Sequence, residues 1–406
     1  MMETVSVFGL GYVGLPLAVL AKKKGFRVYG VDVSRDAVAK ADAEGVDVLD
    51  GGDAVEKADI VVVCVPTPVD SSFMPDLTAV KTVCRTIANS LRRGKLVIIE
   101  STIYPGVIEE IIQPILEESS LKAGVDFFLA HCPERIDPGN IDWDVGNLPR
   151  VAGGINNESA KKAAEFYRKI IDSEILELSS VRAAEATKIM ENAFRDVNIA
   201  FVNEMAKSFD QIGIDVTEVI KAASTKPFGF LPHHPGCGVG GHCIPVDPYY
   251  LIEKAKQKGF NHRFLSLARQ INNSMPEYTV QKLVEGLNEV GLSVKGTRIC
   301  VLGVSYKKGV EDLRESPALK IIEKIKKMGG KIEVYDPYVP DKSTIKSLKE
   351  CFKSECILIA TDHNEFKEIN EIETGKVKVI IDGRNCLDKN SIKNKGIVYR
   401  GIGRNT

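Results

Sequence analysis

The sequence is poor in the features that assign a chain to a class at once. It has one tryptophan in 406 residues, and its 54 lysines and arginines nearly balance 55 acidic residues. The balanced charge argues against nucleic acid or an anionic membrane as partner. No apolar run reaches about 18 residues without a charge, which argues against a transmembrane helix. The one dense basic segment, 320–331, has helical spacing and is interpreted as a solvated helix face.

Cysteine is present but follows no pattern. The nine cysteines form an odd number without regular spacing. Neither the pair Cys351 and Cys356 nor Cys132 beside His131 has a further ligand at metal-binding spacing. No signal-peptide cleavage pattern follows the N-terminus. We therefore expect a reducing, cytoplasmic compartment and no bound metal ion.

Glycine supplies the first positive signal. Residues 4–34 read as strand, turn, helix and strand, and Gly9, Gly11 and Gly14 form G-x-G-x-x-G between an apolar run and an amphipathic helix. Gly9 permits the tight turn, Gly11 lets a pyrophosphate reach the helix N-terminus, and Gly14 lets the helix lie close to the sheet. In this context the pattern predicts a dinucleotide site.

Asp32 ends the second predicted strand and indicates which dinucleotide is bound. Its carboxylate would accept hydrogen bonds from the ribose hydroxyls and repel a 2′-phosphate, which favours NAD over NADP. Arg35 either flanks the adenine ribose or is an exposed residue of the next helix.

Three more apolar runs, 58–70, 95–106 and 126–139, alternate with helical segments and predict a doubly wound parallel sheet. Each ends in polar, proline-rich residues. Ligands bind beyond the carboxyl ends of such strands, so Thr67, Thr102 and Glu134 are expected on the rim of one crevice. Glu134 is either a base with a raised pKa or a cap or ion-pair partner of Arg135.

The middle of the chain is helical and surrounds a second glycine-rich segment. A long helix is predicted over 183–213, suited to a subunit interface, and another over 262–290. Lys188 and Asn192 lie four residues apart, on one helix face. Between the helices, GVGGHCIPVDP at 238–248 sets Cys243 among glycines, which suits a covalent catalyst but also a small buried cysteine in a tight connection.

The chain begins again as an α/β unit near residue 297. Gly303 follows the first strand without companion glycines, so this unit is a degraded or differently used nucleotide fold. Lys307 and Arg314 in the following loop are either phosphate contacts or solvated loop charges, and their place at the ligand end of a sheet favours phosphate.

Together these segments resemble the UDP-glucose/GDP-mannose dehydrogenase family over residues 3–400. GLGYVG, VPTP, STIYPG, CPER, the Lys188 and Asn192 pair, GGHCIPVDP and SYKKGVEDLRESP occur in the family's order. The resemblance implies an enzyme that oxidises the C6 alcohol of a nucleotide sugar to a carboxylate with two NAD. It also implies an NAD-binding Rossmann domain (1–183), a central helical dimerisation domain (184–290) and a Rossmann-like UDP-binding domain (291–406).

The resemblance further implies roles for individual residues. Cys243 is expected to hold the sugar as a thiohemiacetal and then a thioester. Lys188 and Asn192 stabilise oxyanions, Thr102 and Asp247 act on a catalytic water, and Glu134 helps to release the acid. The predicted contacts are Gly9, Gly11, Tyr12, Val13, Gly14, Asp32, Arg35, Thr67, Thr102 and Arg314 for NAD, and Glu134, Arg135, Lys188, Asn192, His233, His234, Gly240, Gly241 and Lys307 for substrate.

The motif details favour one branch of that family. CPERIDPGN, CIPVDP and the loop VPTPVDSSFMPDLTAV differ from the patterns typical of relatives that act on UDP-glucose, and resemble the N-acetylhexosamine branch. UDP-ManNAc or UDP-GlcNAc is therefore expected as substrate, with UDP-glucose as the alternative. A two-electron hydroxyacid dehydrogenase, or a sensor that binds without turnover, is a further alternative, and a homodimer without nucleic-acid or membrane partners is expected.

Overall fold

The computed structural model describes residues 2–70, 74–137, 140, 142–371 and 375–404. The chain falls into two compact units. Unit 1 comprises residues 1–191 and 249–261, and unit 2 comprises residues 192–248 and 262–406. The two predicted sequence motifs that follow strands, the glycine turn and the SYKKGVEDLRESP loop, therefore belong to different units.

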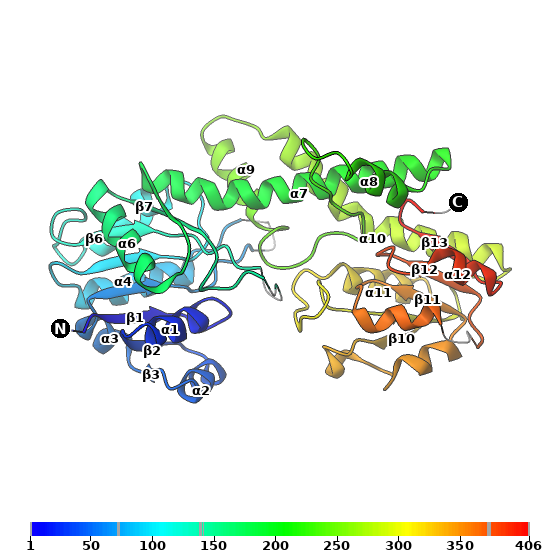
Figure 1. Ribbon diagram of the computed structural model, residues 1–406, viewed down its shortest axis with the longest axis horizontal. Helices are drawn as coiled ribbons and strands as arrows, with labels where there is room; N and C mark the ends of the chain where they lie inside the picture. Colours follow the sequence, from blue (N-terminus) through cyan, green and yellow to red (C-terminus); the bar gives the residue numbers. More distant parts are fainter. Residues whose placement is uncertain (1, 71–73, 138–139, 141, 372–374, 405–406) are drawn as a thin grey trace. The chain divides into compact units, whose positions relative to one another are not determined.

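Unit 1 is built on an eight-stranded sheet in the order β3-β2-β1-β4-β5-β6-β7-β8 (Figure 1). Its strands are β1 (Thr4–Phe8), β2 (Arg27–Val31), β3 (Asp47–Val48), β4 (Ile60–Val63), β5 (Leu96–Ile99), β6 (Phe128–His131), β7 (Arg150–Gly154) and β8 (Ile175–Leu178). The chain leaves β1 toward β2 on one side and reaches β4 on the other, so β1 and β4 flank the point where a doubly wound sheet binds its ligand.

Helices cover both faces of this sheet. They are α1 (Gly14–Lys23), α2 (Arg35–Ala43), α3 (Gly51–Lys57), α4 (Thr78–Ser90), the π-helix η1 (Ile108–Ile112), α5 (Gln113–Glu117) and α6 (Asn157–Ile170). One core joins α1 and α6 to the strands through residues such as Leu17, Phe166 and Val62, and the other joins α3, α4 and α5 through Val55, Ile87 and Val61. Alternate strand residues enter opposite cores, which explains the nearly continuous apolar runs.

One strand pair departs from the predicted parallel sheet. β6 and β7 run antiparallel, with Ala130 opposite Gly154 and His131 opposite Gly153. The two strands are joined by residues 132–149, whose described part contains no helix, whereas a parallel neighbour needs a crossover connection. The predicted α/β class is confirmed, and this one antiparallel step is a correction to its details.

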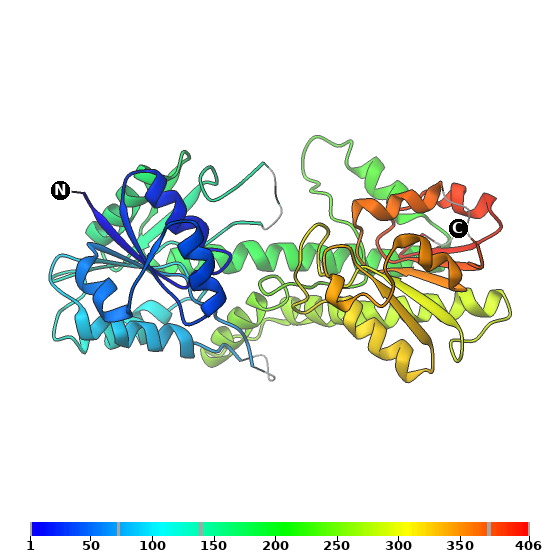
Figure 2. The ribbon, with the colours of Figure 1, turned by 90° about the horizontal axis from the view of Figure 1, so that it is seen from below.

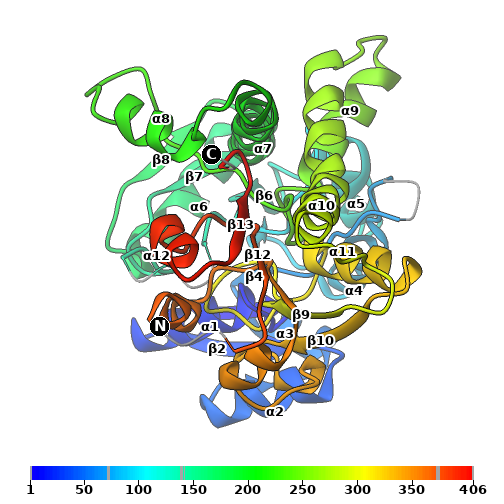
Figure 3. The same ribbon diagram turned by 90° about the vertical axis from the view of Figure 1, so that its right-hand side faces the viewer.

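Unit 2 contains a smaller, all-parallel sheet in the order β10-β9-β11-β12-β13. The strands are β9 (Arg298–Leu302), β10 (Lys331–Tyr335), β11 (Cys356–Ile359), β12 (Val379–Asp382) and β13 (Val398–Gly401). Around it lie α8 (Val216–Ala223), α10 (Arg263–Glu289), α11 (Pro317–Lys327), the 3-10 helices η2 (Pro340–Lys342), η3 (Leu348–Lys353) and η4 (Asn364–Asn370), and α12 (Lys389–Asn394). Figure 3 shows α10 beside α11, and both pack on one sheet face through residues such as Leu283 and Ile321.

Two helices begin in one unit and end in the other. α7 (Val181–Ile212), drawn in green in Figure 2, has its first eleven residues in unit 1, and α9 (Asp247–Gln257) has its first two in unit 2. The predicted helices over 183–213 and 262–290 thus correspond to α7 and α10, whereas α9 was not predicted. The domain limits predicted at 183 and 290 stay a prediction.

Candidate active site

The glycine turn of unit 1 joins β1 to α1 and has the geometry that a dinucleotide requires. Gly9 has a φ of +90°, and its N–H donates to Val31 O at 2.8 Å. A Cβ on Gly14 would lie 1.8 Å from Gly9 O, so only glycine fits there. A Cβ on Gly11 would meet no atom within 4 Å, which leaves the backbone open on the side where a phosphate would approach.

Asp32 follows β2 directly and is held beside this turn. Its carboxylate accepts the Leu10 N–H at 2.6 Å and the Ser34 N–H at 2.8 Å, and the residue stays half-buried. The carboxylate is thus oriented but still accessible to a ribose hydroxyl. Arg35 is exposed and begins α2, as one of the two predicted alternatives stated, and Tyr12 is also largely exposed. These residues fit a bound dinucleotide.

The strand-end threonines lie side by side in unit 1. Thr67 follows β4 and its hydroxyl donates to Thr102 O at 2.7 Å, beyond the end of β5. The Thr67 carbonyl in turn accepts the hydroxyl of Tyr250, a residue of α9. The structure therefore brings together two of the predicted rim residues, and it adds Tyr250, which no sequence pattern had indicated.

Glu134 and Arg135 lie after β6 but have different partners. Glu134 is 9% exposed and accepts the Ile136 N–H, while Arg135 pairs with Glu191 at 2.6 Å and donates to Pro149 O at 2.9 Å. The guanidinium of Arg135 thus turns toward Glu191 of α7, and the two predicted alternatives for Glu134 stay predictions. Part of the neighbouring segment, 138–139 and 141, lies outside the described residues.

Glu185 fixes the start of α7 and was missed by the sequence analysis. Its carboxylate is fully buried and accepts the Gly106 N–H at 2.6 Å and the Ile108 N–H at 2.8 Å, at the start of η1. Burial raises the pKa of Glu185 to about 7. Lys188 lies three residues further on α7 and is 6% exposed. Glu185 thereby connects the helix that carries Lys188 to the loop that carries Thr102.

Cys243, Asn192 and Asp247 all belong to unit 2. The amide of Asn192 donates to Asp247 Oδ2 at 2.5 Å, and both residues are buried. The Asp247 N–H donates to Cys243 O at 2.8 Å, where the loop enters α9. Cys243 itself is half-buried. The start of α9 thus places the Asp247 carboxylate on the segment that bears the half-buried thiol, and α7 supplies the Asn192 carboxamide that contacts it.

The glycines before Cys243 lie against Tyr306 of the loop after β9. A Cβ on Gly240 would lie 2.7 Å from Tyr306 Cβ, and one on Gly241 would lie 3.0 Å from Tyr306 Cε2. The Gly241 N–H also donates to Arg314 O at 2.9 Å. These two glycines, predicted as substrate contacts, therefore let the cysteine loop pack on the loop after β9.

The remaining predicted contacts of unit 2 are more exposed. The guanidinium of Arg314 pairs with Asp312 at 2.6 Å, and its side chain is 46% exposed. His233 contacts the ring of Phe194 edge-on, at a centroid distance of 6.3 Å, and His234 is exposed. Arg314, predicted as a cofactor contact, lies in unit 2, whereas the glycine turn lies in unit 1.

A glycine turn with a strand-end acid, a second nucleotide-type sheet, and a half-buried cysteine beside an Asn–Asp pair define a nucleotide-dependent dehydrogenase. The chain belongs to the UDP-glucose/GDP-mannose dehydrogenase family, as its resemblance implied. The family's NAD binding domain matches residues 3–52 and 48–171, its central domain matches 182–274, and its UDP binding domain matches 300–389. NAD is therefore the cofactor.

Relatives match the chain over nearly its whole length. The UDP-N-acetyl-D-mannosamine dehydrogenase of Pyrococcus horikoshii is 39% identical, covering 98% of this chain and 99% of the relative. The UDP-N-acetyl-D-glucosamine 6-dehydrogenase of Pseudomonas aeruginosa is 36% identical over 95% and 97%. A solved structure of the UDP-D-ManNAc dehydrogenase of Pyrococcus horikoshii has a TM-score of 0.91 at 37% identity, covering 99% of this chain and 100% of the other.

A helix that crosses a membrane must be long and apolar, and the described helices of this chain differ from that. Within the described ranges, none is both long and apolar enough to cross a bilayer.

Proposed function

We propose that the protein oxidises the C6 alcohol of a UDP-N-acetylhexosamine, UDP-ManNAc or UDP-GlcNAc, to the uronic acid. The observation that carries the proposal is the full-length match to relatives with these two activities. The accessible Cys243 beside the Asn192–Asp247 pair supports it, because a four-electron oxidation must retain an aldehyde between its two steps. When bound, NAD accepts one hydride in each of the two oxidations.

The roles proposed for the residues are those that the family resemblance implies, and they agree with the chemistry of each side chain. The Cys243 thiolate adds to the C6 aldehyde and forms a thiohemiacetal, and loss of the second hydride from C6 gives a thioester. Lys188 and the Asn192 amide stabilise the oxyanion at each addition. Water then adds to the thioester carbon, its proton passes to Asp247 or Glu134, and the carboxylate leaves as the thiolate is regenerated. Thr102 holds the water.

The substrate is tested by offering the purified protein NAD with UDP-glucose, UDP-GlcNAc, UDP-GalNAc and UDP-ManNAc in separate reactions and measuring NADH. We expect one of the two N-acetylhexosamine substrates to be preferred, with about two NADH formed per uronate. A preference for UDP-glucose would overturn the branch assignment. One NADH per sugar would favour a two-electron dehydrogenase, and tight binding without NADH would favour a sensor.

The covalent role of Cys243 is tested with Cys243→Ser. We expect loss of acid formation, by at least about 1,000-fold, with UDP-sugar binding retained, because a serine hydroxyl is a far weaker nucleophile without an activating base. Cys386→Ser is the matched control, since Cys386 is likewise a half-buried cysteine of unit 2. Undiminished acid formation in Cys243→Ser would overturn the mechanism.

We also propose that the protein is a cytoplasmic homodimer. All nine cysteines lie among the described residues and none forms a disulfide, which suits a reducing compartment. Among the described residues, five large apolar side chains of unit 2 are at least half exposed on α7 and α10, namely Phe194, Phe201, Ile212, Phe264 and Leu267. Such a surface is typical of a subunit interface. Light scattering coupled to size exclusion should give the mass of two chains, and Phe201→Asp should give one.

A further inference from the structure

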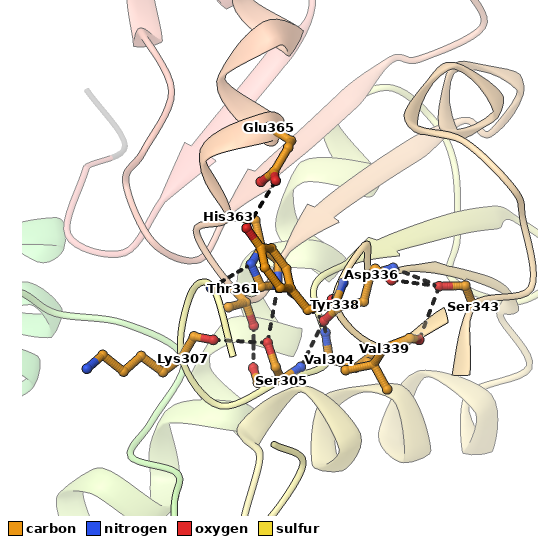
Figure 4. A network of polar contacts seen from close by, with 11 residues as sticks. Val304, Ser305, Lys307, Asp336, Tyr338, Val339, Ser343, Thr361, His363 and Glu365 are labelled. Carbon is orange, nitrogen blue, oxygen red and sulfur yellow. Dashed lines mark hydrogen bonds and ion pairs between the residues drawn. The ribbon is translucent and has the colours of Figure 1, made fainter. Parts of the chain in front are cut away.

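The loop after β9 in unit 2 is held by a buried polar network centred on His363 (Figure 4). His363 follows β11 and is 1% exposed. The Gly309 N–H donates to its Nδ1 at 3.1 Å. A nitrogen that accepts a hydrogen bond carries no proton, so the proton of the neutral ring lies on Nε2. His363 is therefore the Nε2–H tautomer.

The other ring nitrogen faces two acceptors. Nε2 lies 3.2 Å from Asp336 Oδ2 and 3.2 Å from Ser305 Oγ. The Ser305 hydroxyl donates onward to Lys307 O at 3.1 Å, so its oxygen is available to accept the Nε2 proton. The Thr361 hydroxyl donates to Ser305 O at 2.5 Å. The first residues of the loop are thus fixed from both sides.

Asp336, the residue that follows β10, completes the network. Its Oδ2 accepts the Val304 N–H at 2.7 Å and the Ser305 N–H at 3.0 Å, and its side chain has no exposed surface. The ring of Tyr338 stacks on the imidazole at a centroid distance of 4.7 Å, and its hydroxyl donates to Glu365 Oε1 at 3.2 Å. The imidazole is therefore enclosed, and its two nitrogens have different, fixed partners.

The network does not use the side chains that could contact a ligand. Those candidate ligand contacts lie on the loop that the network holds in place. Figure 4 shows the Lys307 side chain extending away from the network. Tyr306, the residue before it, packs against Gly240 and Gly241 of the cysteine loop. The Tyr306 N–H donates to Asp312 O at 2.9 Å, which closes the loop on itself. Ser305 and Gly309, on either side of Lys307, both contact His363.

We propose that His363 is a positioning residue, which holds the 305–309 turn in the conformation that presents Lys307 to a nucleoside diphosphate and supports the cysteine loop through Tyr306. The inference rests on the proposed function, since it assumes that this loop contacts UDP. Two of the ring's polar contacts act on different parts of the loop, because Nδ1 contacts Gly309 and Nε2 contacts Ser305, in addition to Asp336.

Two amide variants separate these contacts. An Asn side chain can place its oxygen near the position of Nδ1 and accept from Gly309, whereas a Gln side chain can place its NH₂ near Nε2 but loses that acceptor. We expect His363→Gln to weaken UDP binding about tenfold, which corresponds to the loss of one hydrogen bond, from the part-buried Gly309 N–H, at about 1.4 kcal/mol. His363→Asn should restore the affinity to within about threefold of the wild type.

UDP and NAD are titrated separately into the full-length protein, and kcat and KM are measured on the preferred UDP-sugar. In His363→Gln we expect the Kd for UDP and the KM for the sugar to rise together, with the Kd for NAD unchanged and kcat lowered less. Tyr338→Phe is the control, because it keeps the stacked ring and loses only the bond to Glu365, and its UDP affinity should be that of the wild type. Unchanged UDP affinity in a folded His363→Gln would overturn the proposal.

A readout without ligand distinguishes this inference from the proposed function. Amide hydrogen exchange of the peptide 305–315 should be faster in His363→Gln than in the wild type, and His363→Asn should slow it again. Failure of the wild type to bind UDP would refute the proposed function, while unchanged exchange would refute the role of His363. If His363→Gln does not fold, Ser305→Ala removes the contacts to Nε2 and Lys307 O, and the same faster exchange is expected.

Discussion

Units 1 and 2 build the same turn after their first strand. Gly9 and Gly303 both have positive φ, at +90° and +81°. Gly9 N donates to Val31 O at 2.8 Å, and Gly303 N donates to Tyr335 O at 2.9 Å. Each acceptor is the last residue of the neighbouring strand. The backbone of the turn is thus common to both units, although only the first turn carries the full glycine pattern.

The acid that follows the second strand differs between the two turns in its surroundings. Asp32 and Asp336 both accept the N–H of the residue after the glycine, from Leu10 at 2.6 Å and from Val304 at 2.7 Å. Asp32 stays half-buried, whereas Asp336 has no exposed surface and is covered by His363. The acid after the second strand is therefore half-buried beside the glycine turn in unit 1, and it is enclosed beside the loop after β9 in unit 2.

We expect the largest effect from adding a side chain to the glycine turn of unit 1. Gly14→Ala would place a methyl group 1.8 Å from Gly9 O, so the turn must open or α1 must move. We expect NAD affinity to fall at least about 100-fold, together with about 1–3 kcal/mol of unfolding free energy. Isothermal titration with NAD measures the first, and urea unfolding the second.

The corresponding position of unit 2, counted from Gly303, is the exposed Lys308. Lys308→Ala should leave NAD affinity and unfolding free energy nearly unchanged. A comparable loss of NAD affinity in both variants would show that the two turns do not differ as described.

The next largest effect is a difference in unfolding free energy between substitutions of Asp336 and of Asp32. Asp336→Asn leaves the Val304 and Ser305 N–H groups with a poorer, partly donating partner, so we expect a loss of about 2–3 kcal/mol in unfolding free energy. Asp32→Asn, at a half-buried site, should cost less than about 1 kcal/mol. Urea unfolding of both variants checks this order, and equal losses would contradict the structural role of Asp336.

A smaller effect is expected in cofactor choice. Asp32→Ser removes the carboxylate that repels a 2′-phosphate, so the preference for NAD over NADP should fall about tenfold, or about 1.4 kcal/mol. Asp336→Ser should leave the preference unchanged in whatever fraction remains folded. The ratio of kcat/KM for the two cofactors is the measurement, and comparable wild-type activity with NADP would refute the assignment of Asp32.

The smallest effect is a pH dependence. Burial raises the pKa of Asp336, but hydrogen bonds from His363 and from the Ser305 and Val304 amides outweigh it and hold the pKa well below its usual range. A depressed pKa contributes stability that is present above the ordinary value of about 4 and is lost as the pH falls below it. The difference in unfolding free energy between wild type and Asp336→Asn should therefore shrink between pH 5 and about pH 3. A constant difference would contradict it.

Much of the fold follows from local pattern. The apolar runs and glycine spacing predict β1, β2, β4, β5, β6 and β9, the glycine turn, α7 and α10, because each signal lies within one segment. β7 was not predicted, and its antiparallel pairing with β6 depends on contacts between residues that are distant along the chain. α9 escaped prediction because Asp247 and Pro248 were interpreted only as part of the cysteine motif.

The residues of the candidate site likewise include some that the sequence predicts and some that it does not. Cys243, Lys188, Asn192 and the glycines stand in motifs whose chemistry is readable from residue type. Glu185 and His363 do not, because an isolated buried acid or histidine has the same sequence signature as an exposed one.

The sequence by itself therefore determined the class of protein, the cofactor turn and the reactive residue types, since backbone freedom and side-chain chemistry are local properties. The tertiary structure decided which acid is enclosed, why Gly240 and Gly241 are glycines, and which nitrogen of His363 accepts a hydrogen bond. Each of these depends on atoms that are brought together from distant parts of the chain.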